Sequence, residues 1–259
     1  MGSLSNIGRI FYGIAIAVLG FLTIYYKDFP YMLLPPNHVS ISGLIILAYI
    51  SGAMLVLAGA CIVFEKNPMS VSLLLGTVLL LIFCFYYIPY QFMVSPNYMY
   101  LRDWENGEKE LALSSGAFVI AGCYVEKNKK NLTSFFGKLI PFGAIFFSIT
   151  IISFGILHFM YAKEASDYIP SWVPNHIFWM YFTGAALIGA AIAIILKINI
   201  RLIATLLGTM MFIWFIILHI PRVIASPVAD IGDEIASAML ALGYSGITFV
   251  IAGSGKKTA

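Results

Sequence analysis

Charged residues and cysteines are scarce in this sequence. Only 10% of its 259 residues are Asp, Glu, Lys or Arg, whereas soluble domains average about 25%. The three cysteines, Cys61, Cys84 and Cys123, include no CxxC pair, so neither a disulfide framework nor a dithiol centre is indicated. We expect all three to be small buried apolar residues. The low charge argues against a soluble domain.

Long apolar runs are abundant instead. Hydrophobic residues make up 61% of the chain, and its mean hydropathy is +0.92. Eight runs approach the roughly 20 apolar residues that a helix needs to cross a bilayer, and their continuity favours helices over the alternating strands of a barrel. We therefore predict an all-α integral membrane protein with eight transmembrane helices, near residues 8–26, 42–64, 69–89, 109–125, 138–161, 176–196, 199–219 and 234–253.

Basic residues divide unequally between the two sides that eight spans define. Ten of the fifteen lie on the side of the termini, and the other five are Lys27, Arg102, Lys109, Lys163 and Arg222. The positive-inside rule then places both termini in the cytoplasm. We predict a multi-pass protein of the bacterial inner membrane, with the first run retained and the acidic loops on the periplasmic side.

Short sequences recur at a nearly constant offset, which indicates an internal duplication. Units with an even number of spans have the same orientation, so the repeat would be parallel. We predict a first four-helix unit over 1–126, a cytoplasmic linker over 127–133 and a second unit over 134–259. The recurring sequences are Pro36-Asn37-His38 with Pro174-Asn175-His176, Leu74-Leu75-Gly76-Thr77 with Leu206-Leu207-Gly208-Thr209, Ile88-Pro89 with Ile220-Pro221, and Phe118-Val119-Ile120-Ala121-Gly122 with Phe249-Val250-Ile251-Ala252-Gly253.

Small residues are expected at helix contacts, because in lipid they allow backbones to approach closely. They are densest in the sixth predicted span, which we therefore expect to be the most tightly surrounded helix. Replacement of Gly189 in that span by leucine should disrupt packing. No acidic or basic residue lies inside a predicted span away from its ends, and ion-coupled transporters normally need such groups.

A cluster of polar and aromatic side chains is expected at the periplasmic face of the second unit. Three histidines there come from the ends of three different spans, without an HxxH or HExxH spacing, so we predict no metal site. Arg222 is expected to pair with Asp230, Asp233 or Glu234. The aromatic residues are alternatively anchors at the membrane interface. The histidines are alternatively a polar cap over the mouth of the bundle. Catalytic residues stay unassigned, and the candidate ligand-binding residues are His158, Trp172, His176, Trp179, His219 and Arg222.

Three segments resemble the DoxX-like family of bacterial four-span membrane proteins. They are Gly155-Ile156-Leu157-His158-Phe159, Tyr168-Ile169-Pro170-Ser171-Trp172-Val173-Pro174 and Tyr181-Phe182-Thr183-Gly184. The resemblance covers roughly 138–253 and, more faintly, the first unit. It implies a membrane four-helix bundle, and some members are quinone-reducing subunits of sulfur-compound oxidoreductases or partners in thiol and oxidative-stress systems. An acidic residue typical of the family's second helix is replaced here by Met54-Leu55 and Ala186-Leu187.

Three functions follow as hypotheses. The first is a redox-associated protein that binds a quinone or similar amphiphile near the periplasmic face of the second unit, with a membrane subunit of a quinone-linked oxidoreductase as its enzymatic form. Quinone carbonyls need hydrogen-bond donors, and histidine exchanges protons near neutral pH. The second is a non-enzymatic accessory or scaffold that docks a periplasmic or membrane protein. The third is a transporter of small solutes or lipids. The lipid bilayer is the surrounding partner, and no nucleic acid is expected.

Overall fold

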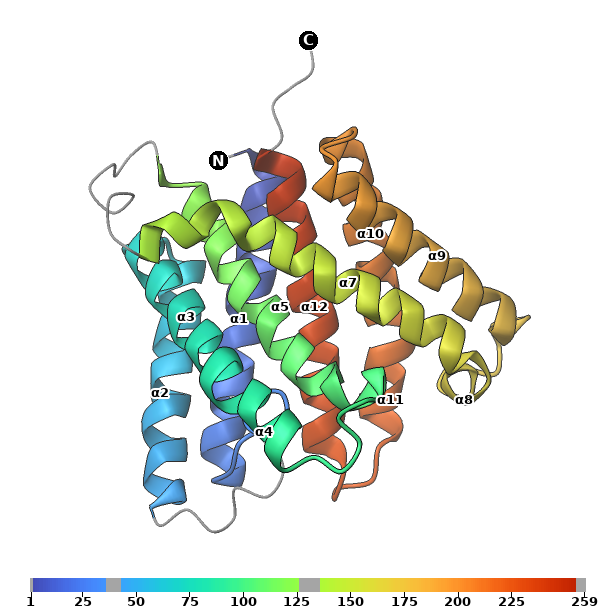
Figure 1. Cartoon of the computed structure of the whole chain (residues 1–259), viewed down its shortest axis with the longest axis horizontal. Helices are drawn as coiled ribbons and strands as arrows, with labels where there is room; N and C mark the ends of the chain where they lie inside the picture. Colours follow the sequence, from blue (N-terminus) through green and yellow to red (C-terminus); the bar gives the residue numbers. More distant parts are fainter. Residues whose placement is uncertain (1, 36–42, 126–135, 255–259) are drawn as a thin grey trace.

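Every regular element described in the computed structural model is helical (Figure 1). The model describes residues 2–35, 43–125 and 136–254, and for these the all-α prediction is confirmed. The repeated Pro36-Asn37-His38 and the predicted linker over 127–133 lie outside the described residues. Within them, seven helical stretches are long and apolar enough to cross a membrane, so the chain is a multi-pass membrane protein. These are α1 (Ser3–Tyr26), α2 (Leu44–Val63), Pro68–Met93, Phe136–Met160, α9 (His176–Ile195), Ile200–Ala225 and α12 (Ile231–Ser254).

Two of these stretches contain a single π-helical turn. Pro68–Met93 consists of α3 (Pro68–Ile82), the π turn η2 (Phe83–Tyr87) and α4 (Ile88–Met93). Ile200–Ala225 consists of α10 (Ile200–Trp214), η5 (Phe215–His219) and α11 (Ile220–Ala225). An Ile-Pro pair follows each π turn directly. The proline has no backbone N–H to donate to the preceding turn, and the wide π turn lies at this position in both helices. Both helices continue past the proline, and the predicted ends at 89 and 219 are wrong.

The fourth predicted span, 109–125, corresponds to α5 (Leu101–Gly122), which is not among the seven candidates. It begins earlier than predicted, and six of its first ten residues are charged. It nevertheless lies within the bundle, packed against α3, α12 and the following helix α7 (Gly143–Met160). Neighbouring helices bury Glu110 and partly bury Glu105, Glu108 and Lys109, whereas Arg102 and Asp103, in the first turn at the distal end, are exposed. Its charged residues are Arg102, Asp103, Glu105, Glu108, Lys109 and Glu110.

The centre of the bundle is formed by α1, α12 and α5. The α12 helix packs along α1 and α10 and also touches α5, while α2 covers α1 and α9 covers α7. A 3₁₀ segment, η4 (Phe136–Phe142), leads into α7, and the short α8 (Ala162–Ser166) follows it. Figure 1 shows that α1 begins and α12 ends at the same end of the bundle. We call the opposite end, which carries α4, α8, α11 and the first turns of α5 and α12, the distal end.

The tightest helix contact is between α1 and α12. A Cβ on Gly246 would lie 2.5 Å from the carbonyl oxygen of Gly8 and 2.8 Å from the Tyr12 nitrogen. Of the most apolar stretch of α12, 78% is buried, against 33% for α9, so the expectation that the sixth span is the most tightly surrounded is wrong. Nothing lies within 4 Å of a Cβ placed on Gly189. That glycine faces outward, and its predicted role in packing is also wrong.

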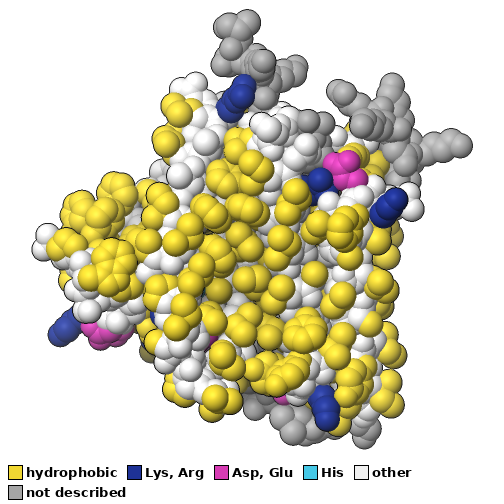
Figure 2. All heavy atoms as spheres, turned by 180° about the vertical axis from the view of Figure 1, so that it is seen from behind, with side chains coloured by type: hydrophobic (Ala, Val, Ile, Leu, Met, Phe, Trp, Pro, Cys, Tyr) yellow, Lys and Arg dark blue, Asp and Glu magenta, His cyan; other side chains and the backbone are white. Residues whose placement is uncertain are grey.

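The surface agrees with a membrane environment. Figure 2 shows one face on which hydrophobic side chains cover the middle, while the Lys, Arg, Asp and Glu side chains in view lie near its margins. Such a broad exposed apolar surface is rare in soluble monomers and is typical of contact with lipid. Cys84 is itself exposed, so its predicted burial is wrong, and Cys61 and Cys123 are only partly buried.

Arg9 connects α1 to the end of α2. Its side chain is 7% exposed and donates to the carbonyl oxygens of Ile62 and Val63. Nη2 lies 3.2 Å from Oε1 of Glu65. The two carbonyls lie in the last turn of α2, where intrahelical donors run out, and Ile62 accepts a long backbone bond from the Glu65 N–H at 3.4 Å. Hydrogen bonds to charged groups stabilise proteins by about 1.5–3 kcal/mol each.

We expect Arg9→Met to lower the free energy of unfolding by about 2–3 kcal/mol, because the helix-end carbonyls lose a charged donor. Thermal unfolding in mild detergent measures the effect. Lys66→Met, which removes an exposed charge just after α2, is the control and should leave the midpoint unchanged. Equal midpoints for the two variants would show that the Arg9 contacts do not stabilise the fold.

Candidate functional site

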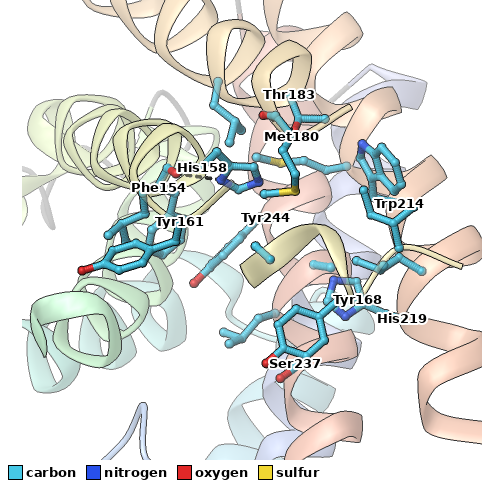
Figure 3. A pocket seen from close by; sticks show the side chains of 18 of the residues that line it. Phe154, His158, Tyr161, Tyr168, Met180, Thr183, Trp214, His219, Ser237 and Tyr244 are labelled. Atoms are coloured by element: carbon cyan, nitrogen blue, oxygen red, sulfur yellow. Dashed lines mark hydrogen bonds between the residues drawn. The ribbon is translucent and has the colours of Figure 1, made fainter. Parts of the chain in front are cut away.

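A cavity of about 510 Å³ lies in the distal half of the ring formed by α7, α9, α10 and α12 (Figure 3). Adjacent helices of this ring pack directly from α7 to α9, from α9 to α10 and from α10 to α12. The ring closes through the Tyr244 side chain of α12, whose ring centroid lies 6.1 Å from that of Phe147 and 6.0 Å from that of Phe154 on α7. The α7 and α12 helices touch through these side chains, and their backbones do not approach closely. Space is therefore left between the two helices.

Aromatic and methionine side chains form the apolar wall. The Trp179 and Trp214 rings meet edge to face with centroids 6.0 Å apart, and the Trp179 indole N–H donates to the carbonyl oxygen of Pro174 at 3.1 Å. Met180, Met210 and Met211 lie beside them in the lining. Unbranched methionine side chains adapt to irregular shapes. The wall is therefore suited to a flat ring or an aliphatic chain.

His158 and Tyr244 each present a hydrogen-bonding atom without a partner to the interior of the cavity. His158 donates from Nδ1 to the carbonyl oxygen of Phe154, one turn earlier, at 2.7 Å, so Nε2 of the neutral ring is left as an acceptor. Figure 3 shows this ring extending from α7 toward Met180. The Tyr244 hydroxyl is buried without a hydrogen-bond partner, and a phenol can donate. The cavity thus offers a free acceptor and a free donor.

A cation and its partners lie at the mouth. Nη2 of Arg222 contacts Oε1 of Glu234 at 2.5 Å, which is one of the pairs that the sequence predicted. The guanidinium also lies 4.3 Å from the centroid of the Tyr168 ring. Its remaining N–H groups are available to a ligand. Beside it, Nδ1 of His219 is buried without a partner. The mouth is therefore rich in potential donors.

The first half of the chain contributes the remaining side of the cavity. Arg102, Glu105 and Lys109 of α5 all belong to the lining. Nζ of Lys109 lies 2.7 Å from Oε1 of Glu105, and the Arg102 guanidinium lies 5.1 Å from the centroid of the Tyr161 ring. The Glu105–Lys109 spacing predicts a pair on one helix face, but the sequence carries no signal that this face meets the second half.

Four of the six predicted site residues come together here: His158, Trp179, His219 and Arg222 line the cavity. Trp172 is 67% exposed, and Nε2 of His176 lies 3.2 Å from the Pro170 oxygen at the start of α9. Neither belongs to the lining, and His158 and His219 lie apart in Figure 3, so the three histidines do not converge. Sequence reasoning missed Arg102, Glu105, Lys109, Tyr161, Tyr168, Met180, Thr183, Met210, Met211, Trp214, Ser237 and Tyr244.

Some of these missed residues had a usable signal. Trp214 and Tyr244 are amphipathic side chains in the middle of apolar runs, where a polar atom needs a partner. Among the described residues, no three His, Cys, Asp or Glu side chains gather closely enough to hold a metal ion. The groups that face the cavity are hydrogen-bond donors, hydrogen-bond acceptors and rings.

Comparisons of the chain with protein-family models, curated proteins and solved structures found no match. The DoxX-like resemblance therefore stays a prediction that depends on the three motifs around the cavity.

Proposed function

We propose that this chain is a DoxX-like protein of the bacterial inner membrane that binds a quinone or a similar amphiphile in the cavity and serves a redox system. The observation that carries the proposal is the division of the cavity into an apolar wall of rings and methionines and a polar margin with His158, Tyr244 and Arg222. Its volume of about 510 Å³ lies in the range of small-molecule sites, about 300–1,000 Å³.

The polar margin suits both oxidation states of such a ligand. A quinone carbonyl only accepts hydrogen bonds, and Arg222 and the Tyr244 hydroxyl are able to donate them. A quinol hydroxyl donates, and Nε2 of His158 is able to accept. An aliphatic tail would lie along the methionine side chains. In this proposal the electrons come from a partner protein, and the distal end faces the periplasm with both termini in the cytoplasm, as the distribution of basic residues favours.

We also propose that the chain consists of two parallel four-helix units. Matched contacts support this arrangement. Ser114 donates to the Gly76 carbonyl oxygen at 2.7 Å, and Ser245 donates to the Gly208 carbonyl oxygen at 2.9 Å. These serines and glycines occupy equivalent positions in the predicted repeat. The π turns η2 and η5, each of five residues before Ile-Pro, are also equivalent.

Backbone conformations and glycine contacts repeat as well. Left-handed backbone occurs at Glu65 and Asn67 before α3 and at Lys197 and Asn199 before α10. A Cβ on Gly20 or Gly155 would lie within 3 Å of the carbonyl oxygen of Gly52 or Gly184, respectively. Tandem copies of one unit account for these similarities without separate explanations, and most of the lining of the larger cavity comes from the second copy.

We expect His158→Leu to weaken binding of the reduced quinol about tenfold, because the acceptor Nε2 is lost and one hydrogen bond contributes about 0.5–1.5 kcal/mol. Leucine keeps apolar bulk at this position. Equilibrium dialysis of a short-tailed benzoquinol, kept reduced, measures the affinity.

His176→Leu is the matched control, since this histidine lies outside the cavity, and it should bind like the parent. If His158→Leu also binds like the parent, the ligand position is wrong. If the parent binds no quinone but retains a stoichiometric protein partner, the proposal fails in favour of the accessory function.

A further inference from the structure

Glu110 is a buried carboxyl group in the first half of the chain, outside the cavity described above. Its side chain is fully buried, and neither carboxylate oxygen has a hydrogen-bond partner. The other glutamates of α5 are different, because Glu105 pairs with Lys109 and Glu108 accepts from the Ser153 hydroxyl at 2.7 Å. An unpaired charge in a water-free bundle is strongly unfavourable. The burial of Glu110 without a partner therefore needs a physical explanation, whereas Glu105 and Glu108 have partners.

Among the described residues of all the helices packed on α5, no Lys, Arg or His lies within salt-bridge distance of the Glu110 carboxylate. On the same face of α5, one turn earlier, a Cβ on Gly107 would lie 3.2 Å from the Tyr87 ring and 3.4 Å from the Phe83 ring. Residues three apart share a helix face, so Glu110 is directed toward η2. The ionisable groups of η2 within its electrostatic reach are Cys84 and Tyr87, and both are uncharged near neutral pH. Binding of a proton is the available way to neutralise the carboxylate.

A second cavity, of about 310 Å³, approaches this carboxyl from the distal end. Tyr87, Gln91 and Asn106 belong to its lining. Asn106 lies one helical turn before Glu110 on α5, and Tyr87 belongs both to this lining and to the surroundings of Glu110. The Tyr87 hydroxyl donates to the carbonyl oxygen of Tyr31. Polar side chains thus reach from the distal surface to within a turn of the buried acid.

We propose that Glu110 is a proton-binding site inside the first half of the bundle, held as the neutral acid and connected to the distal side through the second cavity. A π turn at this position is consistent with a functional site, since such turns are frequent there. The equivalent residue of the proposed second unit is Ala241, in the wall of the larger cavity. The inference is independent of what that larger cavity binds.

A hydrophobic carbodiimide tests the protonation state. A protonated carboxyl adds across one C=N bond of dicyclohexylcarbodiimide, and the adduct rearranges to a stable N-acylurea with no leaving group. Mass spectrometry of peptides from folded protein at neutral pH should find the adduct at Glu110, with much less at Glu105, which pairs with Lys109. Glu110→Gln, which keeps the shape of the side chain, should lose it. A water-soluble carbodiimide should modify exposed Asp103 but not Glu110. Absence of the adduct at Glu110 in folded protein would overturn the proposal.

Infrared spectroscopy tests the connection to the distal side. The carbonyl stretch of a protonated carboxyl is resolved from ionised carboxylates and shifts in D₂O. We expect a band that is missing in Glu110→Gln, and a shift that is slower in Asn106→Leu, which replaces a polar side chain of the second cavity by an apolar one. A band unchanged by Glu110→Gln would contradict the proton site, and an equal rate in Asn106→Leu would contradict the route. Neither result bears on quinone binding, so failure here is distinguishable from failure of the proposed function.

Discussion

Replacement of Gly246 by leucine is expected to prevent the protein from folding to a stable bundle. The backbone of α12 approaches α1 so closely here that even a Cβ would lie 2.5 Å from the Gly8 oxygen. Backbone atoms cannot move aside as a flexible side chain can, so the two central helices would have to separate. Overpacking typically costs 1–3 kcal/mol, and for this backbone contact we expect a loss of at least about 3 kcal/mol. The yield of monodisperse protein and its unfolding midpoint in detergent measure the effect.

Gly189→Leu is the matched control for this prediction. It makes the same chemical change in a membrane helix, at a glycine with open space around it, and should express and unfold like the parent. A well-folded Gly246→Leu protein would contradict the described contact between α1 and α12. Loss of folding in Gly189→Leu would instead show that α9 is covered by something other than lipid.

Replacement of Ala241 by tryptophan is expected to abolish ligand binding while the fold is retained. Ala241 lines the cavity from α12, and an indole there would occupy much of the space between Tyr244 and the tryptophan wall. Because the added atoms enter an existing cavity, the cost in stability should be small compared with that at Gly246. We expect affinity for a short-tailed benzoquinone to fall at least a hundredfold. Equilibrium dialysis measures it without depending on tryptophan fluorescence.

Ile213→Trp is the control for the added indole. Ile213 lies on α10 and is 48% exposed, so its replacement faces lipid and should leave affinity unchanged. If Ala241→Trp folds and binds with the affinity of the parent, the ligand does not occupy this cavity. Equal loss of binding in both variants would show that the added indole acts at the lipid-facing surface and not inside the cavity.

The apolar runs were sufficient to predict seven spans, because length and continuity of hydrophobic residues determine which helices are able to cross a bilayer. The run over 109–125 also indicated α5, but not its first turns. Six of its first ten residues are charged, so hydrophobicity did not indicate that the helix begins at Leu101, where it packs in the bundle with α3, α7 and α12. The helix ends after Pro89 and Pro221 were also missed, since a π turn that accommodates a proline has no signature in hydrophobicity.

The candidate site was predictable where it depended on helix ends. His158, His219 and Arg222 lie near the ends of apolar runs, and all three line the same cavity, although the two histidines lie apart within it. Trp172 and His176 have the same sequence signal, but the chain between α8 and α9 directs them away from the cavity. The contribution of α5 required knowledge of how the two halves pack. Likewise, the small residues of α9 suggested burial, whereas the close backbone contact is at Gly246.

Native mass spectrometry of protein extracted gently from its own membrane tests the central claim most directly. The account predicts one adduct with the mass of a quinone on each parent chain, and none on Ala241→Trp prepared in the same way. A parent chain without any adduct in several detergents, or an adduct that persists in Ala241→Trp, would contradict the claim that this cavity is a quinone site.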